Sequence, residues 1–224
     1  MTWTKSLDRS AAGESVNAVR LTASIFGAYA GLLGVEHGFL EMLHGNVAPN
    51  SLRIMASPFE LPFPFGHEPA MTLIPSFLVT GIAAIVVGLA IVVWSTAFVQ
   101  RKHGAVVLFW LSIALLLVGG GFGPVSLLIV ACVAASRIGE PLTWWRRCLP
   151  EVLRGLLAKL WPWALAGALL WVPGEFAMGQ ILHLKNDQRQ ILSNLNLMLS
   201  YPMLVLFALT LIAGFGHEIN KGRE

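Results

Sequence analysis

The chain has 224 residues, of which 56% are hydrophobic and only 12% are Asp, Glu, Lys or Arg, and its net charge is +3. A soluble domain carries about 25% charged residues, so this chain has too few charges to cover a surface exposed to water. The composition therefore excludes a soluble globular enzyme, a disordered tail protein and a nucleic-acid-binding domain. It predicts an all-α fold, a polytopic membrane helix bundle that forms a single transmembrane domain over residues 1–224.

Apolar stretches long enough to cross a bilayer define the predicted helices. The bilayer core is about 30 Å thick and requires about 20 helical residues. We predict six membrane-spanning helices, at about 21–43, 70–99, 104–120, 123–137, 160–183 and 190–215. The uncharged region 104–136 is too long for one span, and a run of glycines followed by Pro124 interrupts it. Glycine weakens a helix and proline starts one well, so two short helices joined by a tight turn are expected there.

The distribution of basic residues predicts the orientation. With both termini in the cytoplasm, only Arg53, Lys185 and Arg189 of the 15 Lys and Arg residues lie on the outer side. A basic excess on the inner side is typical of multi-pass membrane proteins. We therefore expect a multi-pass protein of the plasma membrane, of the bacterial inner-membrane type, whose inner basic residues contact anionic lipid and no nucleic acid.

Two connecting segments have unusual compositions. The outer loop 45–69 contains five prolines, and proline and phenylalanine alternate in residues 57–67, a run that is typical of neither a helix nor a regular strand. We interpret it as a rigid interfacial connector, with a lid over a site as the alternative. The inner segment 138–159 contains the run Trp-Trp-Arg-Arg at 144–147, then a helix start at Glu151. This composition favours an interfacial anchor, and a regulatory lipid site is the alternative.

The first predicted span carries a narrow stripe of glycines. Its members are Gly27, Gly31, Gly34 and Gly38. Small residues at this spacing let a second helix approach closely. We expect the partner to lie within the chain, at Gly81 and Gly88 of the second span. The alternative is a homodimer, or another membrane protein, packed on the same stripe.

Ionisable side chains gather at the outer ends of the predicted spans. His37, Glu41 and His44 share one face of the first span, at spacings that bring helical side chains together. Two imidazoles and one carboxylate could hold a metal ion, so these three residues form a candidate metal site. A solvated position at the headgroup level, and a site for a proton or polar substrate, are the alternatives. Glu36 is expected to point the opposite way and to need another partner.

The fifth predicted span contains a second candidate position. Pro173 should bend the helix, Gly174 adds room, and Glu175 follows directly. An isolated charge at this depth is unfavourable, so we predict that His37 or Glu41 lies within reach of Glu175 directly or through one water. His183 lies farther toward the outer side. A haem held by His37 or His44 opposite His183 is possible but is not the favoured interpretation.

These features favour a small transporter, or a membrane protein that binds a proton or polar ligand, near the outer side of the bundle. The candidate binding residues are Glu175, His37, Glu41, His44, His183 and Glu36. One alternative is an accessory structural subunit of a membrane complex. The other is a membrane enzyme that binds a metal or haem at the outer leaflet. No cofactor and no catalytic residue is assigned.

Overall fold

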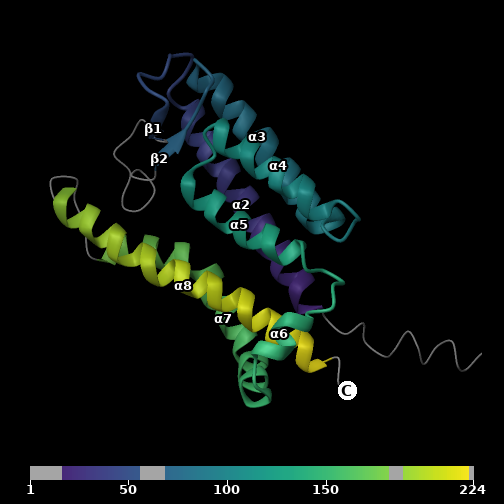
Figure 1. The fold of residues 1–224 in the computed structure, drawn as a ribbon. Coiled ribbons are helices and arrows are strands. Elements are labelled where there is room, and N and C mark those ends of the chain that lie inside the picture. The colour runs from purple at the N-terminus through teal and green to yellow at the C-terminus, as the bar shows by residue number, and fades with distance from the viewer. Residues whose placement is uncertain (1–16, 56–68, 182–188, 222–224) are drawn as a thin grey trace, which may run out of the picture.

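A computed structural model describes residues 17–55, 69–181 and 189–221, and these residues are mostly helical (Figure 1). In chain order, the elements are α2 (Ala18–Met42), β1 (Arg53–Met55), β2 (Pro69–Met71), α3 (Phe77–Val93), the π-helix η1 (Trp94–Phe98), α4 (Gly104–Leu117), α5 (Phe122–Ala135), α6 (Thr143–Cys148), α7 (Glu151–Ile181) and α8 (Arg189–Lys221).

Four helical stretches of the described chain are long and apolar enough to cross a membrane. They are Ala18–Met42, Phe77–Phe98, Glu151–Trp171 and Tyr201–Asn220. By length and composition, they are compatible with a helical membrane protein. Helices α4 and α5 have 14 residues each. At 1.5 Å per residue each is about 21 Å long, shorter than a bilayer core of about 30 Å. The predicted division of residues 104–136 into two helices is confirmed.

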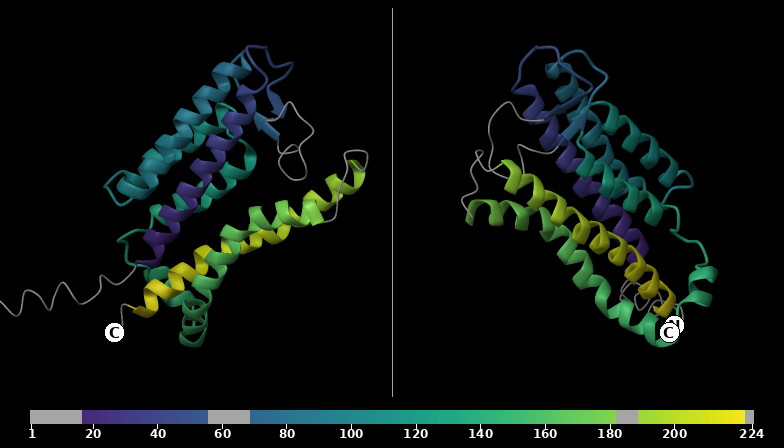
Figure 2. Two further views of the ribbon diagram at one scale, coloured as in Figure 1. Left: turned by 180° about the vertical axis from the view of Figure 1, so that it is seen from behind. Right: turned by 60° about the vertical axis from the view of Figure 1, so that its left-hand side comes forward.

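Helix α2 lies at the centre of a bundle formed with α3, α4 and α5, and α7 and α8 form a long antiparallel pair (Figures 1 and 2). The pair contacts α2 near the beginning of that helix and diverges from the bundle toward the opposite end (Figure 2). At the contact, Trp161 Nε1 donates a hydrogen bond of 3.0 Å to Thr22 Oγ1. The rings of Phe26 and Phe207 meet edge to face, with centroids 5.4 Å apart.

The beginning of α2 is capped by the end of α8. Asn17 precedes the helix and accepts a 2.7 Å hydrogen bond from the backbone N–H of Arg20. The carboxylate of Glu218 accepts hydrogen bonds from the side chain of Asn17 (3.2 Å) and from the backbone N–H of Ala18 (3.0 Å). These contacts satisfy donors that every helix leaves unpaired in its first turn. They also bring the two ends of the described chain together.

The glycine stripe of α2 is the surface on which α3 packs. A Cβ atom on Gly31 would lie 2.6 Å from the carbonyl oxygen of Gly88. One on Gly38 would lie 2.5 Å from the carbonyl oxygen of Gly81. The two backbones are therefore too close for any side chain at these positions. The predicted pairing of the stripe with Gly81 and Gly88 is confirmed.

The remaining members of the stripe are also covered within the chain. A side chain at Gly27 would overlap Ser95 of η1, and a Cβ on Gly34 would lie 2.9 Å from Leu115 of α4. Because α3, η1 and α4 occupy the stripe, a second copy or another membrane protein could reach it only by displacing them. The stripe is therefore packed against helices of the same chain, and the alternative of a homodimer or a membrane partner on these glycines stays a prediction.

The opposite face of α3 is apolar and exposed. Its exposed residues are Val79, Ile82, Val86, Leu89 and Val93. Alternating spacings of three and four residues place them in one stripe along the helix. An apolar stripe that faces outward along the whole helix is compatible with contact to lipid.

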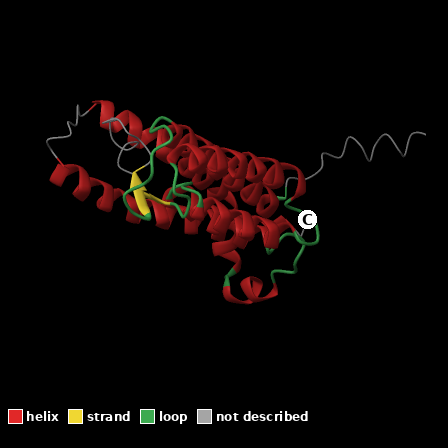
Figure 3. Cartoon of the chain, turned by 90° about the horizontal axis from the view of Figure 1, so that it is seen from above, coloured by secondary structure: helices red, strands yellow, loops and turns green. Residues whose placement is uncertain are grey.

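A short β-ribbon departs from the all-α prediction (Figure 3, yellow). Strands β1 and β2 are antiparallel, with Ile54 opposite Ala70. Both of these side chains are buried, whereas Arg53 and Met55 are exposed. This alternation is typical of a strand with one buried face. Strand β1 lies within the predicted outer loop and β2 begins at its last residue, Pro69, the first position of the strand, where proline is tolerated. Residues 56–68, with most of the proline and phenylalanine run, lie outside the described residues.

We predict that Gly38→Ala destabilises the protein, because the added methyl group meets the backbone of α3. Overpacking of this kind lowers the free energy of unfolding by about 1–3 kcal/mol. The measurement is denaturant unfolding in mixed micelles. Gly155→Ala in α7 is the control, since a Cβ there meets nothing within 4 Å. This variant should be neutral, or stabilised by up to about 1 kcal/mol. Equal effects of the two substitutions would contradict the packing described.

Candidate functional site

Glu41 lies in the last turn of α2, and its side chain is 0% exposed. Neither carboxyl oxygen has a hydrogen-bond partner among the described residues. A Cβ atom on Gly119 would overlap both oxygens, so the carboxyl group lies directly against the turn between α4 and α5. A buried carboxylate without a partner costs several kcal/mol. The surroundings of Glu41 therefore favour binding of a positively charged species, of which a proton is the smallest.

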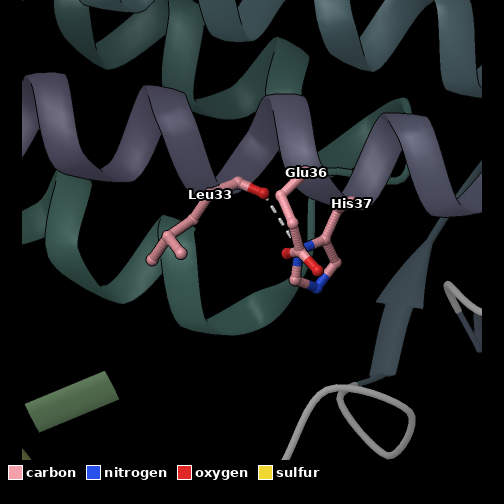
Figure 4. Close-up of polar contacts among 3 residues, drawn as sticks. All are labelled: Leu33, Glu36 and His37. Atoms are coloured by element: carbon pink, nitrogen blue, oxygen red, sulfur yellow. Dashed lines mark hydrogen bonds and ion pairs between the residues drawn. The ribbon is translucent and has the colours of Figure 1, made fainter. Parts of the chain in front are cut away.

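His37 lies one turn before Glu41 and is 4% exposed. Its Nδ1 atom is 3.1 Å from the carbonyl oxygen of Leu33 and 3.2 Å from a carboxylate oxygen of Glu36 (Figure 4). Both neighbours are acceptors, so we assign the proton to Nδ1. A Cβ on Gly121 would lie 2.5 Å from Nε2. The imidazole therefore presents Nε2 to the same turn that Glu41 contacts.

The prediction that Glu36 points away from this face is wrong. Its carboxylate turns back along the helix surface to the imidazole of His37, the next residue (Figure 4). About a third of the Glu36 side chain remains exposed (32%). Glu36 thus orients the ring of His37 from the edge of the site.

The turn between α4 and α5 requires glycine for two reasons. Gly119 and Gly121 have φ angles of +93° and +80°, a region that other residues rarely adopt. Both also lack the side chain that would collide with Glu41 or His37. The turn is held in place by its backbone, because Gly119 N–H donates to Met71 O (2.8 Å) and Leu73 N–H donates to Leu117 O (3.0 Å). The chain segment around β2 is thus hydrogen-bonded to the turn that covers Glu41.

A pair of threonines lies beside this turn. Thr72 and Thr80 are both buried, and their hydroxyl oxygens are 2.5 Å apart. The backbone N–H of Ile74 donates to Thr72 Oγ1, and Thr72 pairs with Val118 in an antiparallel bridge. One hydroxyl of the pair donates to the other, which leaves one hydroxyl proton for a further acceptor. Sequence reasoning missed both residues. Their polar character at the outer end of the second predicted span was the available signal.

The structure does not bring His37, Glu41 and His44 together as one metal site. Helix α2 ends at Met42, so His44 lies beyond it, and its ring stacks on Phe77 with centroids 4.1 Å apart. Across the three described ranges, no group of three His, Cys, Asp or Glu side chains is placed to hold a metal ion. The predicted triad assumed that the helix continues through residue 44, whereas α2 ends at Met42.

The remaining candidates lie on or near α7. The backbone of Glu175 is helical, but its side chain lies outside the described part of the structure, as does all of His183. The contacts given above between α2 and the α7–α8 pair lie at the beginning of α2, around Thr22 and Phe26. The convergence of Glu175 with His37 or Glu41 stays a prediction.

Comparisons with protein-family models, curated proteins and solved structures found no match.

We predict that Gly119→Ala is more destabilising than Gly139→Ala. Both glycines have positive φ, but a Cβ on Gly139 meets nothing within 4 Å. Strain alone should cost about 1–2 kcal/mol at either position. Contact with Glu41 should add about 1–3 kcal/mol at Gly119.

The double variant Gly119→Ala/Glu41→Ala isolates that contact. Truncation of Glu41 should recover about 0.5–3 kcal/mol of the loss, measured as a double-mutant cycle of unfolding free energies. A cycle with strictly additive effects would mean that Glu41 does not lie against the turn.

Proposed function

We propose that this chain is an integral membrane protein that takes up a proton at Glu41, and that it acts as a small transporter or proton-binding membrane protein. The observation that carries the proposal is the fully buried carboxyl group of Glu41, whose oxygens have no hydrogen-bond partner among the described residues. Ionisable groups inside membrane bundles are unfavourable and are characteristic of proton and ion pathways.

A proton fits this position better than a metal cation. Calcium and magnesium require six or more oxygen ligands, supplied by the protein or by water. Glu41 offers two oxygens and lies against a turn too tight for a methyl group. A proton needs only one carboxyl oxygen and no added space.

His37 is the second member of the proposed site. An imidazole gains and loses a proton near neutral pH more readily than any other unperturbed side chain. Glu36 and the carbonyl of Leu33 orient its ring, and Nε2 faces the turn beside Glu41. In this arrangement His37 passes protons between Glu41 and the surface at which Glu36 is partly exposed.

We further propose that the chain crosses the plasma membrane six times, with both termini on the cytoplasmic side. The hydrogen bonds between Asn17, Ala18 and Glu218 support an even number of crossings, because they join the first and last helices at one end. Helices α4 and α5 would form the shortest pair of crossings. The inner basic residues would contact anionic lipid.

Cysteine labelling tests the topology. In a background lacking Cys132 and Cys148, an impermeant thiol reagent applied from outside should label cysteines placed at 50 and 187. It should label cysteines placed at 102 or 146 only after the membrane has been permeabilised. Labelling of position 146 from outside would overturn the orientation and the count of six spans.

Glu41→Gln tests the proton site. The amide keeps the size of the side chain but cannot take up a proton. We expect infrared difference spectra of the protein in lipid vesicles, recorded between high and low pH, to contain a carboxyl protonation band that Glu41→Gln removes. Glu41→Asp should keep a shifted band. Glu36→Gln is the matched control, because Glu36 is partly exposed one turn away, and its loss should leave the buried band in place.

Persistence of the full band in a folded Glu41→Gln protein would remove Glu41 from the proposed site. Glu175→Gln serves as a parallel arm for the sequence-based hypothesis. A change in the same carboxyl band in Glu175→Gln would mean that Glu175 of α7 belongs to the proton site. An unchanged band would mean that the site is formed by α2 and the α4–α5 turn alone.

A further inference from the structure

One side of α2, in the second half of the helix, is apolar and exposed. The side chains of Leu32, Phe39 and Leu43 are 54%, 57% and 45% exposed. At about 100° per residue they fall within about 40° of one another around the helix, away from the glycine stripe. The α7–α8 pair contacts α2 near its beginning and diverges toward this end, and these three side chains remain uncovered (Figure 2).

Glu36 lies within this apolar side. It follows Leu32 by four residues and precedes Phe39 by three, so the three are neighbours on the helix surface. Its side chain is 32% exposed. Glu36 also lies six residues before Met42, the last residue of α2, which is about 9 Å along the helix axis. A carboxylate at such a depth on an apolar helix surface is unfavourable in a membrane and is characteristic of a functional site.

The described residues supply no permanent positive charge to Glu36. Within them, its ion-pair contact is with Nδ1 of His37, at 3.2 Å, and this imidazole is neutral when it carries one proton (Figure 4). Helices α3, α4 and α5, which surround α2, contain no Asp, Glu, His, Lys or Arg, and the sequence has no Lys or Arg between Arg20 and Arg53. A charge on Glu36 therefore calls for a second proton on His37 or for a cation from outside.

The neighbours of Glu36 indicate what kind of cation fits. The exposed ring of Phe39 can hold a positive charge against its face. Leu32, on the other side of Glu36, offers apolar surface, which attracts an apolar group and excludes the hydration shell of a small inorganic ion. One organic cation with a large apolar body satisfies both requirements, because its charge pairs with Glu36 while its body covers Leu32 and Phe39.

We propose that the exposed side of α2 around Glu36 binds an organic cation with a large apolar body, and that this cation and a proton on His37 displace one another. Cations of this class would be the substrates of the proposed transporter. The exchange with protons rests on the proposed function, whereas the binding of the cation rests on Glu36 and its apolar neighbours.

The competition follows from the contact between Glu36 and His37. A second proton makes the imidazole positive at 3.2 Å from the carboxylate, and a bound organic cation places its charge on the same carboxylate. Two like charges at this separation repel each other, so each weakens the binding of the other. The other titratable groups near this end of α2 are Glu41 and His44, whereas Glu218 of α8 lies at the beginning of the helix.

Equilibrium dialysis of the full-length protein in a non-ionic detergent tests the proposal. The probe is tetraphenylphosphonium, whose charge does not change with pH. We expect saturable binding at pH 8 that weakens as the pH is lowered. Tetramethylammonium, which lacks the apolar body, and triphenylphosphine oxide, which lacks the charge, should bind at least tenfold more weakly.

Substitutions on the exposed side of α2 locate the site. Glu36→Gln should weaken tetraphenylphosphonium binding by about tenfold or more, and Glu36→Asp, which keeps the charge, should retain part of the affinity. Phe39→Ala should weaken binding by about threefold or more. The matched controls are Val86→Ala, an exposed apolar residue of α3, and Glu140→Gln, an exposed carboxylate elsewhere; both should bind as the wild type does.

Equal affinity in Glu36→Gln and the wild type would overturn the proposal, as would affinity that does not change with pH. Equal binding of triphenylphosphine oxide would overturn it too, since the surface would then select apolar molecules without regard to charge. A dimer that Phe39→Ala dissociates, with no binding of the probe, would identify a second copy of the chain as the occupant instead.

The variant Glu41→Gln separates this inference from the proposed function. It should still bind tetraphenylphosphonium at pH 8, because the charge on Glu36 is retained. A failure of the proton site would appear in the infrared experiment, and a failure of the cation site would appear in the dialysis of Glu36→Gln.

Discussion

The close approach of α2 to α3 is the constraint on which the rest of the structure depends. The carbonyl oxygens of Gly81 and Gly88 occupy the space that side chains would take at Gly38 and Gly31. Contacts of this kind allow almost no sliding, because the next register along either helix would place a larger residue against the partner backbone. Since Gly38 lies one turn before Glu41, the register of the two helices also determines where that carboxyl group meets the α4–α5 turn.

Burial of the carboxyl group of Glu41 under a glycine turn has an energetic cost. Neither of its oxygens has a hydrogen-bond partner in the described chain. Because burial of a polar group without a partner is unfavourable, this position favours the neutral form of the carboxyl group or a bound positive charge. The proposed uptake of a proton meets this requirement without added space, which the close contact with Gly119 does not provide.

Composition and spacing were sufficient to predict the helical bundle, the break at residues 119–124 and the pairing of the glycine stripe with Gly81 and Gly88. The bundle and the break follow from apolar stretches and from the Gly/Pro run, which are local in the sequence. The pairing follows from the spacing of glycines on one face of the first span. The orientation of Glu36 could not be predicted this way, because a flexible side chain turned back to its neighbour His37. The position of His44 depended on where α2 ends. The contacts of Glu41 with the turn, and of Thr72 with Thr80, are tertiary and left no periodic pattern.

The cap that Glu218 places on α2 has a consequence for biosynthesis. The first helix of the described chain emerges from the ribosome about 200 residues before the carboxylate that completes its first turn, as the separation of Ala18 and Glu218 shows. Until α8 is made, the backbone N–H of Ala18 has only water to pair with. The first turn of α2 is therefore completed only when α8 docks on it, near the end of the synthesis of the described chain.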